Sequence, residues 1–266
     1  MGGKRRLVAG TGWKMNNDAA ATRRYAADLY RRLASVDVGA LDLFVLPPFT
    51  SLHAAAEGFA PGPVAIGGQN MHWDDSGAWT GEISAPMLRE AGCRYVELAH
   101  SERLAACGET YETVRRKLNT ALRYGLTPIL CLGETADDRR ADHADAVLGA
   151  QVETALADQP PERVADVILA YEPRWAIGAP EAASTDYVST RHGAIRALVS
   201  RRWGAAAAKA VRIVYGGSVT PDNGPALISL PDVDGLFVSR AALTSAGFAA
   251  IVAIVADAAM TREALP

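Results

Sequence analysis

The chain has 266 residues, about half of them apolar, and its 27 basic and 30 acidic side chains leave a formal charge of −3 at pH 7. So small a charge gives no reason to expect binding to nucleic acid or to a membrane surface, and no continuous run of about 18 apolar residues predicts a membrane span. The three cysteines, Cys93, Cys107 and Cys131, lack metal-ligand or redox spacing, so we expect free thiols and a cytoplasmic protein.

Short apolar segments recur along the whole chain. Eight of them stand out, at residues 7–10, 41–46, 64–67, 95–98, 128–132, 167–171, 211–215 and 235–238. Most are apolar at nearly every position, which is typical of parallel strands buried on both faces. Between them, helical periodicity is clearest at residues 18–33, 111–124, 145–156 and 186–202. The alanine-rich residues 205–208 are expected to form a helix end or a loop.

This alternation of strand and helix, about once every 30 residues, predicts repeated βαβ units. Eight such units close naturally into a (β/α)8 TIM barrel, which we expect to occupy residues 1–266 as a single α/β domain. The alternative is an open, doubly wound sheet, which often carries a Gly-x-Gly-x-x-Gly turn after its first strand. The first strand here runs into Gly10-Thr-Gly12-Trp-Lys-Met, which does not match that turn.

Polar and anion-binding residue types follow most of the predicted strands. In a barrel of this kind the loops that leave the carboxyl ends of the strands build the active site, so these residues should meet at one face. They are Lys14, His100-Ser101-Glu102-Arg103, Gly133-Glu134, Glu172-Pro-Arg-Trp175, Gly216-Gly217-Ser218 and Ser239-Arg240.

Glu172 ends the sixth apolar segment and is followed by proline. A carboxylate in this place is either half of a buried ion pair that braces the barrel or a general base. Partial desolvation would raise its basicity and suit it to the second role.

His100 and Lys14 are the matching candidates at the fourth and first strands. A helix that begins after His100 would keep the imidazole neutral, so that it could donate to a carbonyl oxygen and stabilise an enediolate. Lys14, flanked by Trp13 and Met15, is either a solvated lysine or a cation that attracts an anionic substrate.

The Gly216-Gly217-Ser218 segment is either a simple turn or a nest of backbone N–H groups for a phosphate. The second interpretation is favoured because the loops after strands seven and eight are the usual phosphate site of barrels. Residues 175–178, Trp-Ala-Ile-Gly, are unusually apolar for a surface loop, which indicates a lid that excludes water. No metal-binding, Walker or dinucleotide motif is present, so the set predicts cofactor-free and metal-free proton abstraction next to a carbonyl.

At these residues the chain resembles the triosephosphate isomerase family from the first strand to the eighth. The matching motifs occur in the family's order and are Trp13-Lys-Met-Asn16, Gln69-Asn70, Thr80-Gly-Glu82, His100-Ser-Glu-Arg103, Gly108-Glu-Thr110, Cys131-Leu-Gly-Glu134, Ala170-Tyr-Glu-Pro173, Trp175-Ala-Ile-Gly178, Tyr215-Gly-Gly-Ser-Val219 and Asp232-Val-Asp-Gly235.

The resemblance implies a role for each matching residue. Glu172 would be the base, His100 the electrophile and Lys14 the electrostatic residue, with Glu102 beside it. Residues of the phosphate side would be Gly12, Gly178, Ser218, Gly216, Gly217, Ser239 and Arg240. The lid and its supports would be Ser101, which holds Glu172 when the lid is open, and Trp175, Ile177, Tyr215 and Glu134, with Trp175 meeting Glu134 and Tyr215 latching the lid. A homodimer is implied, with Thr80, Glu82 and Arg103 at its interface.

The chain departs from the family pattern mainly at positions that determine the shape of the substrate site. Gly12 replaces an asparagine, Ser239-Arg240 replaces a Gly-Gly pair, Leu104 stands where a second arginine is common, and the lid hinges carry Arg174 and Pro180. The stretches Gly10-Thr-Gly-Trp-Lys-Met15, Gln69-Asn-Met-His-Trp73 and Gly77-Ala-Trp-Thr-Gly-Glu82, together with Arg240 after the eighth strand, are similar to those of a branch that isomerises erythrulose phosphates. Three functions therefore stay open: triose phosphate isomerisation, the same reaction on a four-carbon ketose phosphate, and a barrel that only binds a phosphorylated metabolite.

Overall fold

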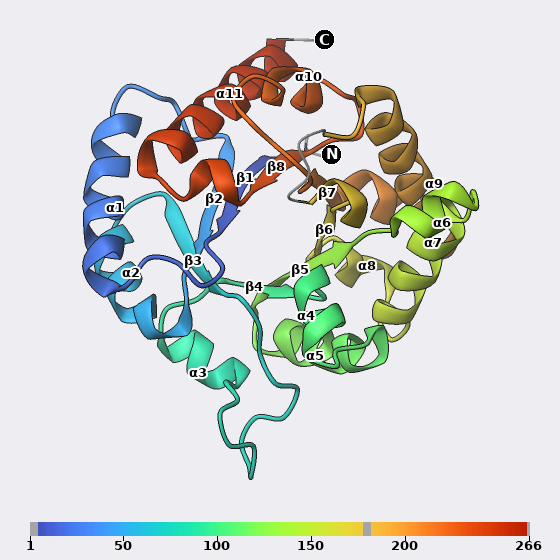
Figure 1. Ribbon diagram of the computed structural model, residues 1–266, viewed down its shortest axis with the longest axis horizontal. Coiled ribbons are helices and arrows are strands. Elements are labelled where there is room, and N and C mark those ends of the chain that lie inside the picture. The colour runs from blue at the N-terminus through green and yellow to red at the C-terminus, as the bar shows by residue number, and fades with distance from the viewer. Residues whose placement is uncertain (1–4, 178–181, 265–266) are drawn as a thin grey trace.

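The computed structural model describes residues 5–177 and 182–264. Eight parallel strands pair in sequence order, and β1 pairs with β8 to close the sheet into a barrel (Figure 1). The strands are β1 (Leu7–Gly12), β2 (Leu41–Leu46), β3 (Val64–Gly68), β4 (Tyr95–Leu98), β5 (Thr127–Leu132), β6 (Ile168–Tyr171), β7 (Arg212–Tyr215) and β8 (Gly235–Val238). Each overlaps its predicted apolar segment, so the TIM barrel is confirmed and the open sheet was the wrong alternative.

Helices surround the strands in Figure 1. They are α1 (Ala19–Leu33), α2 (Leu52–Phe59), α3 (Ala85–Glu90), α4 (Ser101–Ala106), α5 (Tyr111–Arg123), α6 (Ala136–Arg140), α7 (Ala144–Ala155), α8 (Pro161–Val164), α9 (Thr185–Ala210), α10 (Gly224–Ile228) and α11 (Ser245–Ala264). The four predicted helices are confirmed as α1, α5, α7 and α9. Residues 205–208 belong to the last part of α9, beyond a break at Gly204, whose φ of +89° interrupts the helix.

Both faces of the strands are buried, as their continuous apolar character predicted. Val8, Phe44 and Ile129 point into the barrel, where they pack with other interior side chains. Their neighbours Ala9, Leu43 and Leu130 belong to the larger core between strands and helices. Side chains therefore fill much of the interior, and a cavity opens among the described residues at the mouth formed by the carboxyl ends of the strands.

Helix α11 is long and apolar enough over Ser245–Arg262 to span a membrane, by length and mean hydropathy alone. Polar residues such as Asp257 and Thr261 interrupt this stretch, so it is not a continuous apolar run. Phe248, Ile251 and Val255 are buried in the same core cluster as the strands, so these side chains pack the helix against the barrel.

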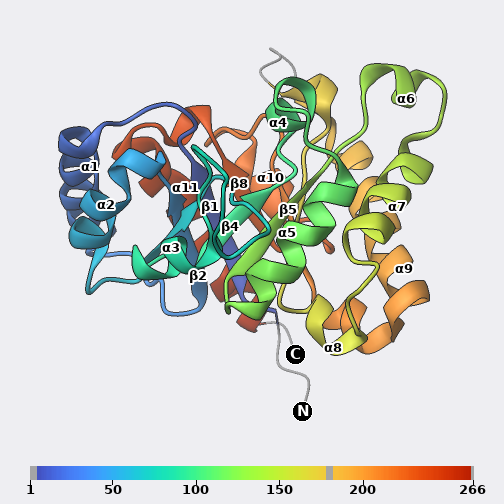
Figure 2. The same cartoon turned by 90° about the horizontal axis from the view of Figure 1, so that it is seen from below.

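The two mouths of the barrel differ. In the side view of Figure 2, α4 and α6, which follow β4 and β5, lie at one end, and α8, which precedes β6, lies at the other. The side chains predicted to react all follow strands, so they gather at the first end. The segment between β3 and α3 projects away from the barrel in Figure 1.

Candidate active site

A cavity of about 540 Å³ opens at the carboxyl ends of the strands. Most predicted site residues that the structure describes line it, namely Gly12, Lys14, His100, Glu102, Glu172, Ile177, Gly216, Gly217, Ser218, Ser239 and Arg240. Glu97 and Phe237 line it as well, although the sequence did not identify them. The barrel therefore brings chemically distinct groups from β1, β4, β6, β7 and β8 to one space.

Lys14 is held by a tight turn after β1. Its φ of +52° is unusual for a residue with a side chain, and the Gln69 side chain donates to its carbonyl oxygen at 2.9 Å. Buried Trp13, packed on Tyr25, anchors the preceding residue in the core. The ammonium group lies 2.6 Å from Oε1 of Glu102, so the cation is fixed at the edge of the cavity.

His100 caps the start of α4. The backbone N–H of Glu102 donates to Nδ1 of His100 at 3.2 Å. A nitrogen that accepts a hydrogen bond carries no proton, so the neutral ring carries its proton on Nε2. Nε2 lies 3.7 Å from Oε2 of Glu172, and a donor is thereby presented to the cavity beside the predicted base.

Glu172 leaves the end of β6 with its carboxyl group in the cavity and only 5% of the residue exposed. Its backbone N–H donates to the Leu132 carbonyl at 2.7 Å, which extends the pairing of β6 with β5. A Cβ atom at Gly216 would lie 2.5 Å from Cγ of Glu172, so glycine is required there for the side chain to take this position.

Burial raises the pKa of Glu172 to about 7. Desolvation is the largest influence on this pKa. The Lys14 ammonium group, and His100 when it is protonated, lower the pKa, whereas Glu97 raises it further. A pKa near 7 suits a group that must accept a proton and return it at neutral pH. The alternative, in which Glu172 is half of a buried ion pair that braces the barrel, loses support. Among residues 5–177 and 182–264, no arginine or lysine forms an ion pair with Glu172.

The loops after β7 and β8 form the side of the cavity where phosphate binding is predicted. Gly217 is constrained there, because a Cβ atom would lie 2.2 Å from the Tyr215 hydroxyl. Ser239 precedes a short 3-10 helix, Arg240–Ala242, and Ser239-Arg240 stands in place of the glycine pair of the family pattern. The phosphate roles of these residues stay predictions, and Gly178 lies outside the described residues.

The described parts of the predicted lid rest on Glu134. Nε1 of Trp175 donates to Oε1 of Glu134 at 2.7 Å, the contact that the family resemblance implies. The hydroxyls of Tyr171 and Tyr187 donate to the same oxygen at 3.2 and 2.9 Å. The Arg139 guanidinium lies 3.9 Å from the centre of the Trp175 ring. The first lid hinge is thus tied to α6 and α9, and Pro180 in the second hinge lies outside the described residues.

Ser101 and Tyr215 are the two other residues that the family resemblance assigns to the support of the lid. Ser101 begins α4, and in the described ranges no hydrogen bond joins it to Glu172, so its contact in the open lid stays a prediction. Tyr215 is fully buried at the end of β7, and burial raises its pKa to about 12. Its action as a lid latch stays a prediction as well.

The predicted dimer residues lie on the surface or beside it. Thr80 and Glu82 are exposed on the projecting segment between β3 and α3. Arg103 is half-buried and lies 3.6 Å from the buried carboxyl group of Glu109 in the same chain. Arg103 therefore forms an ion pair within its own chain, whereas Thr80 and Glu82 are exposed to a partner subunit.

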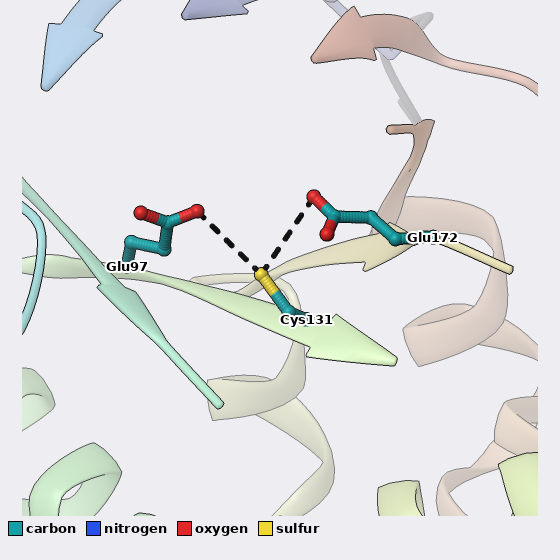
Figure 3. A group of neighbouring side chains, drawn as sticks. All are labelled: Glu97, Cys131 and Glu172. Carbon is teal, nitrogen blue, oxygen red and sulfur yellow. Dashed lines mark hydrogen bonds between the residues drawn. The ribbon is translucent and has the colours of Figure 1, made fainter. Parts of the chain in front are cut away.

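Glu97, which the sequence analysis missed, lies in the middle of β4 and is 6% exposed. Its carboxyl group, the Cys131 thiol and the Glu172 carboxyl group offer oxygen and sulfur atoms within 4.8 Å of one another (Figure 3). Burial raises the pKa of all three groups, which opposes the deprotonated forms that a metal ion needs, so we assign no metal here. A carboxylate inside an apolar strand was the signal that could have revealed Glu97.

The sequence was compared with known proteins, and the matches agree with this arrangement of the site. The family model described as triosephosphate isomerase matches residues 7–255. Triosephosphate isomerase of Symbiobacterium thermophilum is 43% identical over 251 residues, which cover 94% of this chain and 97% of that protein. L-erythrulose-1-phosphate isomerase of Rhizobium etli is 44% identical over 254 residues, which cover 94% and 92%. The chain belongs to the triosephosphate isomerase family and is an isomerase.

Proposed function

We propose that this isomerase interconverts dihydroxyacetone phosphate and glyceraldehyde 3-phosphate through an enediolate, without a cofactor. The observation that carries the proposal is the 3.7 Å separation of His100 Nε2 and Glu172 Oε2 in a cavity that Lys14 also lines. A substrate carbonyl oxygen beside His100 and Lys14 brings the neighbouring C–H bond within reach of Glu172.

The reaction moves one proton between adjacent carbons. The Glu172 carboxylate accepts the proton, the C–H electron pair forms the C=C bond of the enediolate, and the carbonyl electrons pass to oxygen. The His100 Nε2–H group and the Lys14 ammonium stabilise the charge on that oxygen. Transfer of a hydroxyl proton between the two oxygens through His100, and return of the carbon-bound proton from Glu172, complete the isomerisation.

The substrate's phosphate group would lie against Gly216, Gly217, Ser218, Ser239 and Arg240. Backbone N–H groups of a glycine-rich turn form a nest for an anion. Arg240 can add a bidentate contact that a glycine pair does not offer. Ile177, at the described end of the lid, lines the same cavity and supports the exclusion of water during the reaction.

The second candidate is the same proton transfer on a four-carbon ketose phosphate, between L-erythrulose 1-phosphate and D-erythrulose 4-phosphate. Gly12 favours it, because a Cβ atom there would have only ordinary contacts, 3.5 Å from Phe237 Cζ and 3.6 Å from Glu97 Oε2. Because residue 12 lines the cavity without a side chain, the room that a longer side chain would take is left to the substrate. Relatives that carry the L-erythrulose-1-phosphate isomerase name support this candidate.

We also propose a cytoplasmic homodimer, which in the triose reaction would serve glycolysis. Free thiols at buried Cys93 and Cys131 and at exposed Cys107 support a reducing compartment. Trp79 on the projecting segment is 46% exposed and Met15 beside Lys14 is 95% exposed, which supports a partner surface at both places.

Steady-state assays of the purified chain with triose and tetrulose phosphates test the function. Turnover of either substrate without added metal or cofactor supports the proposal, and the larger kcat/KM identifies the preferred chain length. A barrel that only binds its ligand would show no turnover and no exchange of solvent deuterium into the bound ligand, and that result would overturn the proposal.

A further inference from the structure

Glu97 places a second buried carboxyl group in the active-site cavity. Its side chain points into the barrel from β4, and that of Glu172 follows from the end of β6, with the Cys131 thiol of β5 between them (Figure 3). Cys131 Sγ lies 3.8 Å from Oε1 of Glu97 and 3.9 Å from Oε1 of Glu172. The mechanism proposed above uses Glu172 and leaves Glu97 without a role.

The second oxygen of Glu97 faces the space beside Gly12. A Cβ atom on Gly12 would lie 3.6 Å from Oε2 of Glu97, so any longer side chain there would compete for this space. No side chain from residue 12 fills it. Gly12, Glu97 and Phe237 all line the cavity, and together they form a recess with one polar group, called the Glu97 recess below.

Within this recess, Glu97 lies on the wall opposite part of the predicted phosphate side, whereas Gly12 and Phe237 belong to β1 and β8. β4 is four strands away from β8 in the closed barrel of eight, so the two strands face each other across the interior. A substrate whose phosphate contacts the loops after β7 and β8 would direct the other end of its carbon chain across the interior toward β4. Glu97 is therefore placed to meet the end of the substrate that is distant from the phosphate.

Glu97 is suited to remain protonated while Glu172 serves as the base. Burial raises the pKa of Glu97, and the nearby charge of Glu102 adds to this, while His100 and Lys14 oppose it. Two buried carboxyl groups whose oxygens lie within 4.8 Å do not readily ionise together. A neutral carboxyl group both donates and accepts, so it can bind a hydroxyl group without repelling an anionic substrate.

We propose that Glu97 is a specificity-determining residue whose carboxyl group hydrogen-bonds a substrate hydroxyl beyond the two reacting carbons. A triose phosphate ends at its second reacting carbon, whereas a four-carbon ketose phosphate carries a hydroxymethyl group beyond it. The Glu97 recess supplies both the space and the hydrogen-bonding partner for that group. This inference rests on the proposed isomerisation and extends its substrate range to the four-carbon ketose phosphate.

The test compares kcat/KM for L-erythrulose 1-phosphate with kcat/KM for dihydroxyacetone phosphate in the full chain. In Glu97→Leu the ratio of the first to the second should fall about tenfold or more, because one hydrogen bond to the distal hydroxyl is lost. In the matched variant Glu97→Gln, which keeps a donor and an acceptor in nearly the same shape, the ratio should fall by less than about threefold. Gly12→Asn should lower the ratio by filling the recess from the other side.

Circular dichroism and thermal unfolding show whether each variant is folded before its ratio is interpreted. The inference is overturned if the wild-type enzyme turns over the triose but not the tetrulose phosphate, if folded Glu97→Leu keeps the wild-type ratio, or if Glu97→Gln loses as much as Glu97→Leu. Failure of the proposed function differs from all three, because the wild-type chain would then turn over neither substrate.

Discussion

Gly216 lies so close to Glu172 that a Cβ atom at position 216 would be 2.6 Å from the carboxyl oxygen Oε1. Real Cβ atoms do not approach other atoms so closely, so Gly216→Ala must displace the Glu172 side chain. A misplacement of about 1 Å commonly costs about a hundredfold in rate, and we expect kcat to fall by that order.

The matched control for this substitution is Gly149→Ala in α7. A Cβ atom there would lie 3.9 Å from Leu198 Cδ2, which is an ordinary contact, so kcat should stay at the wild-type value. Equal kcat values for Gly216→Ala and the wild-type enzyme would contradict the tight packing of Glu172 on the β7 loop.

The raised pKa of Glu172 predicts how activity depends on pH. The base must be ionised in the free enzyme, so log kcat/KM should rise by about one per pH unit below about pH 7 and level off above it. A profile that levels off near pH 4.5, the ordinary value for a glutamate, would contradict the burial of this group.

The same shift affects stability with a defined sign. Between pH 4.5 and about 7 the folded chain keeps a proton on Glu172 that the unfolded chain has released. The free energy of unfolding should therefore fall as pH rises through this range. Glu172→Gln cannot ionise, so denaturant unfolding at several pH values should show a smaller fall in this variant.

Glu134 accepts hydrogen bonds from Tyr171, Trp175 and Tyr187 while fully buried. Replacement by leucine leaves three donors without this partner, and each unsatisfied buried group costs about 1–3 kcal/mol. We expect Glu134→Leu to lower the free energy of unfolding by about 3 kcal/mol or more in denaturant titrations. Asp137→Asn, at an exposed carboxylate of α6, is the control and should change it by less than about 0.5 kcal/mol.

The projecting segment between β3 and α3 provides a test of assembly. Thr80 is exposed there next to half-exposed Trp79, and a buried charge without a partner is costly at an interface. Thr80→Asp should therefore weaken the proposed homodimer and shift sedimentation velocity toward the monomer. Sedimentation that stays dimeric at every concentration would show that this segment does not make the interface.

The strands were predictable because parallel strands buried on both faces need apolar residues at nearly every position. The gathering of Lys14, His100 and Glu172 followed from this, since the carboxyl ends of all strands meet at one mouth. The φ of +63° at Ala99 could not be predicted, because an alanine adopts it only where tertiary contacts impose it.

Side-chain contacts that depend on long-range packing could also not be predicted from the sequence. The pairing of Arg103 with Glu109 depends on how α4 packs beside the start of α5. Glu97 was visible as a charge within an apolar segment, but its approach to Glu172 depends on the barrel's closure and on the side-chain alternation of β4. The resemblance to a known family drew attention to motif residues and left Glu97 outside them.

The most direct test of the central claim is kcat of Glu172→Gln with the preferred substrate, measured with the wild-type enzyme in parallel. Glutamine keeps the shape of the side chain and cannot accept the substrate proton, so we predict a fall of about a thousandfold, within the range of general-base catalysis. Turnover of the folded variant within a few fold of wild type would contradict the assignment of Glu172 as the group that moves the proton.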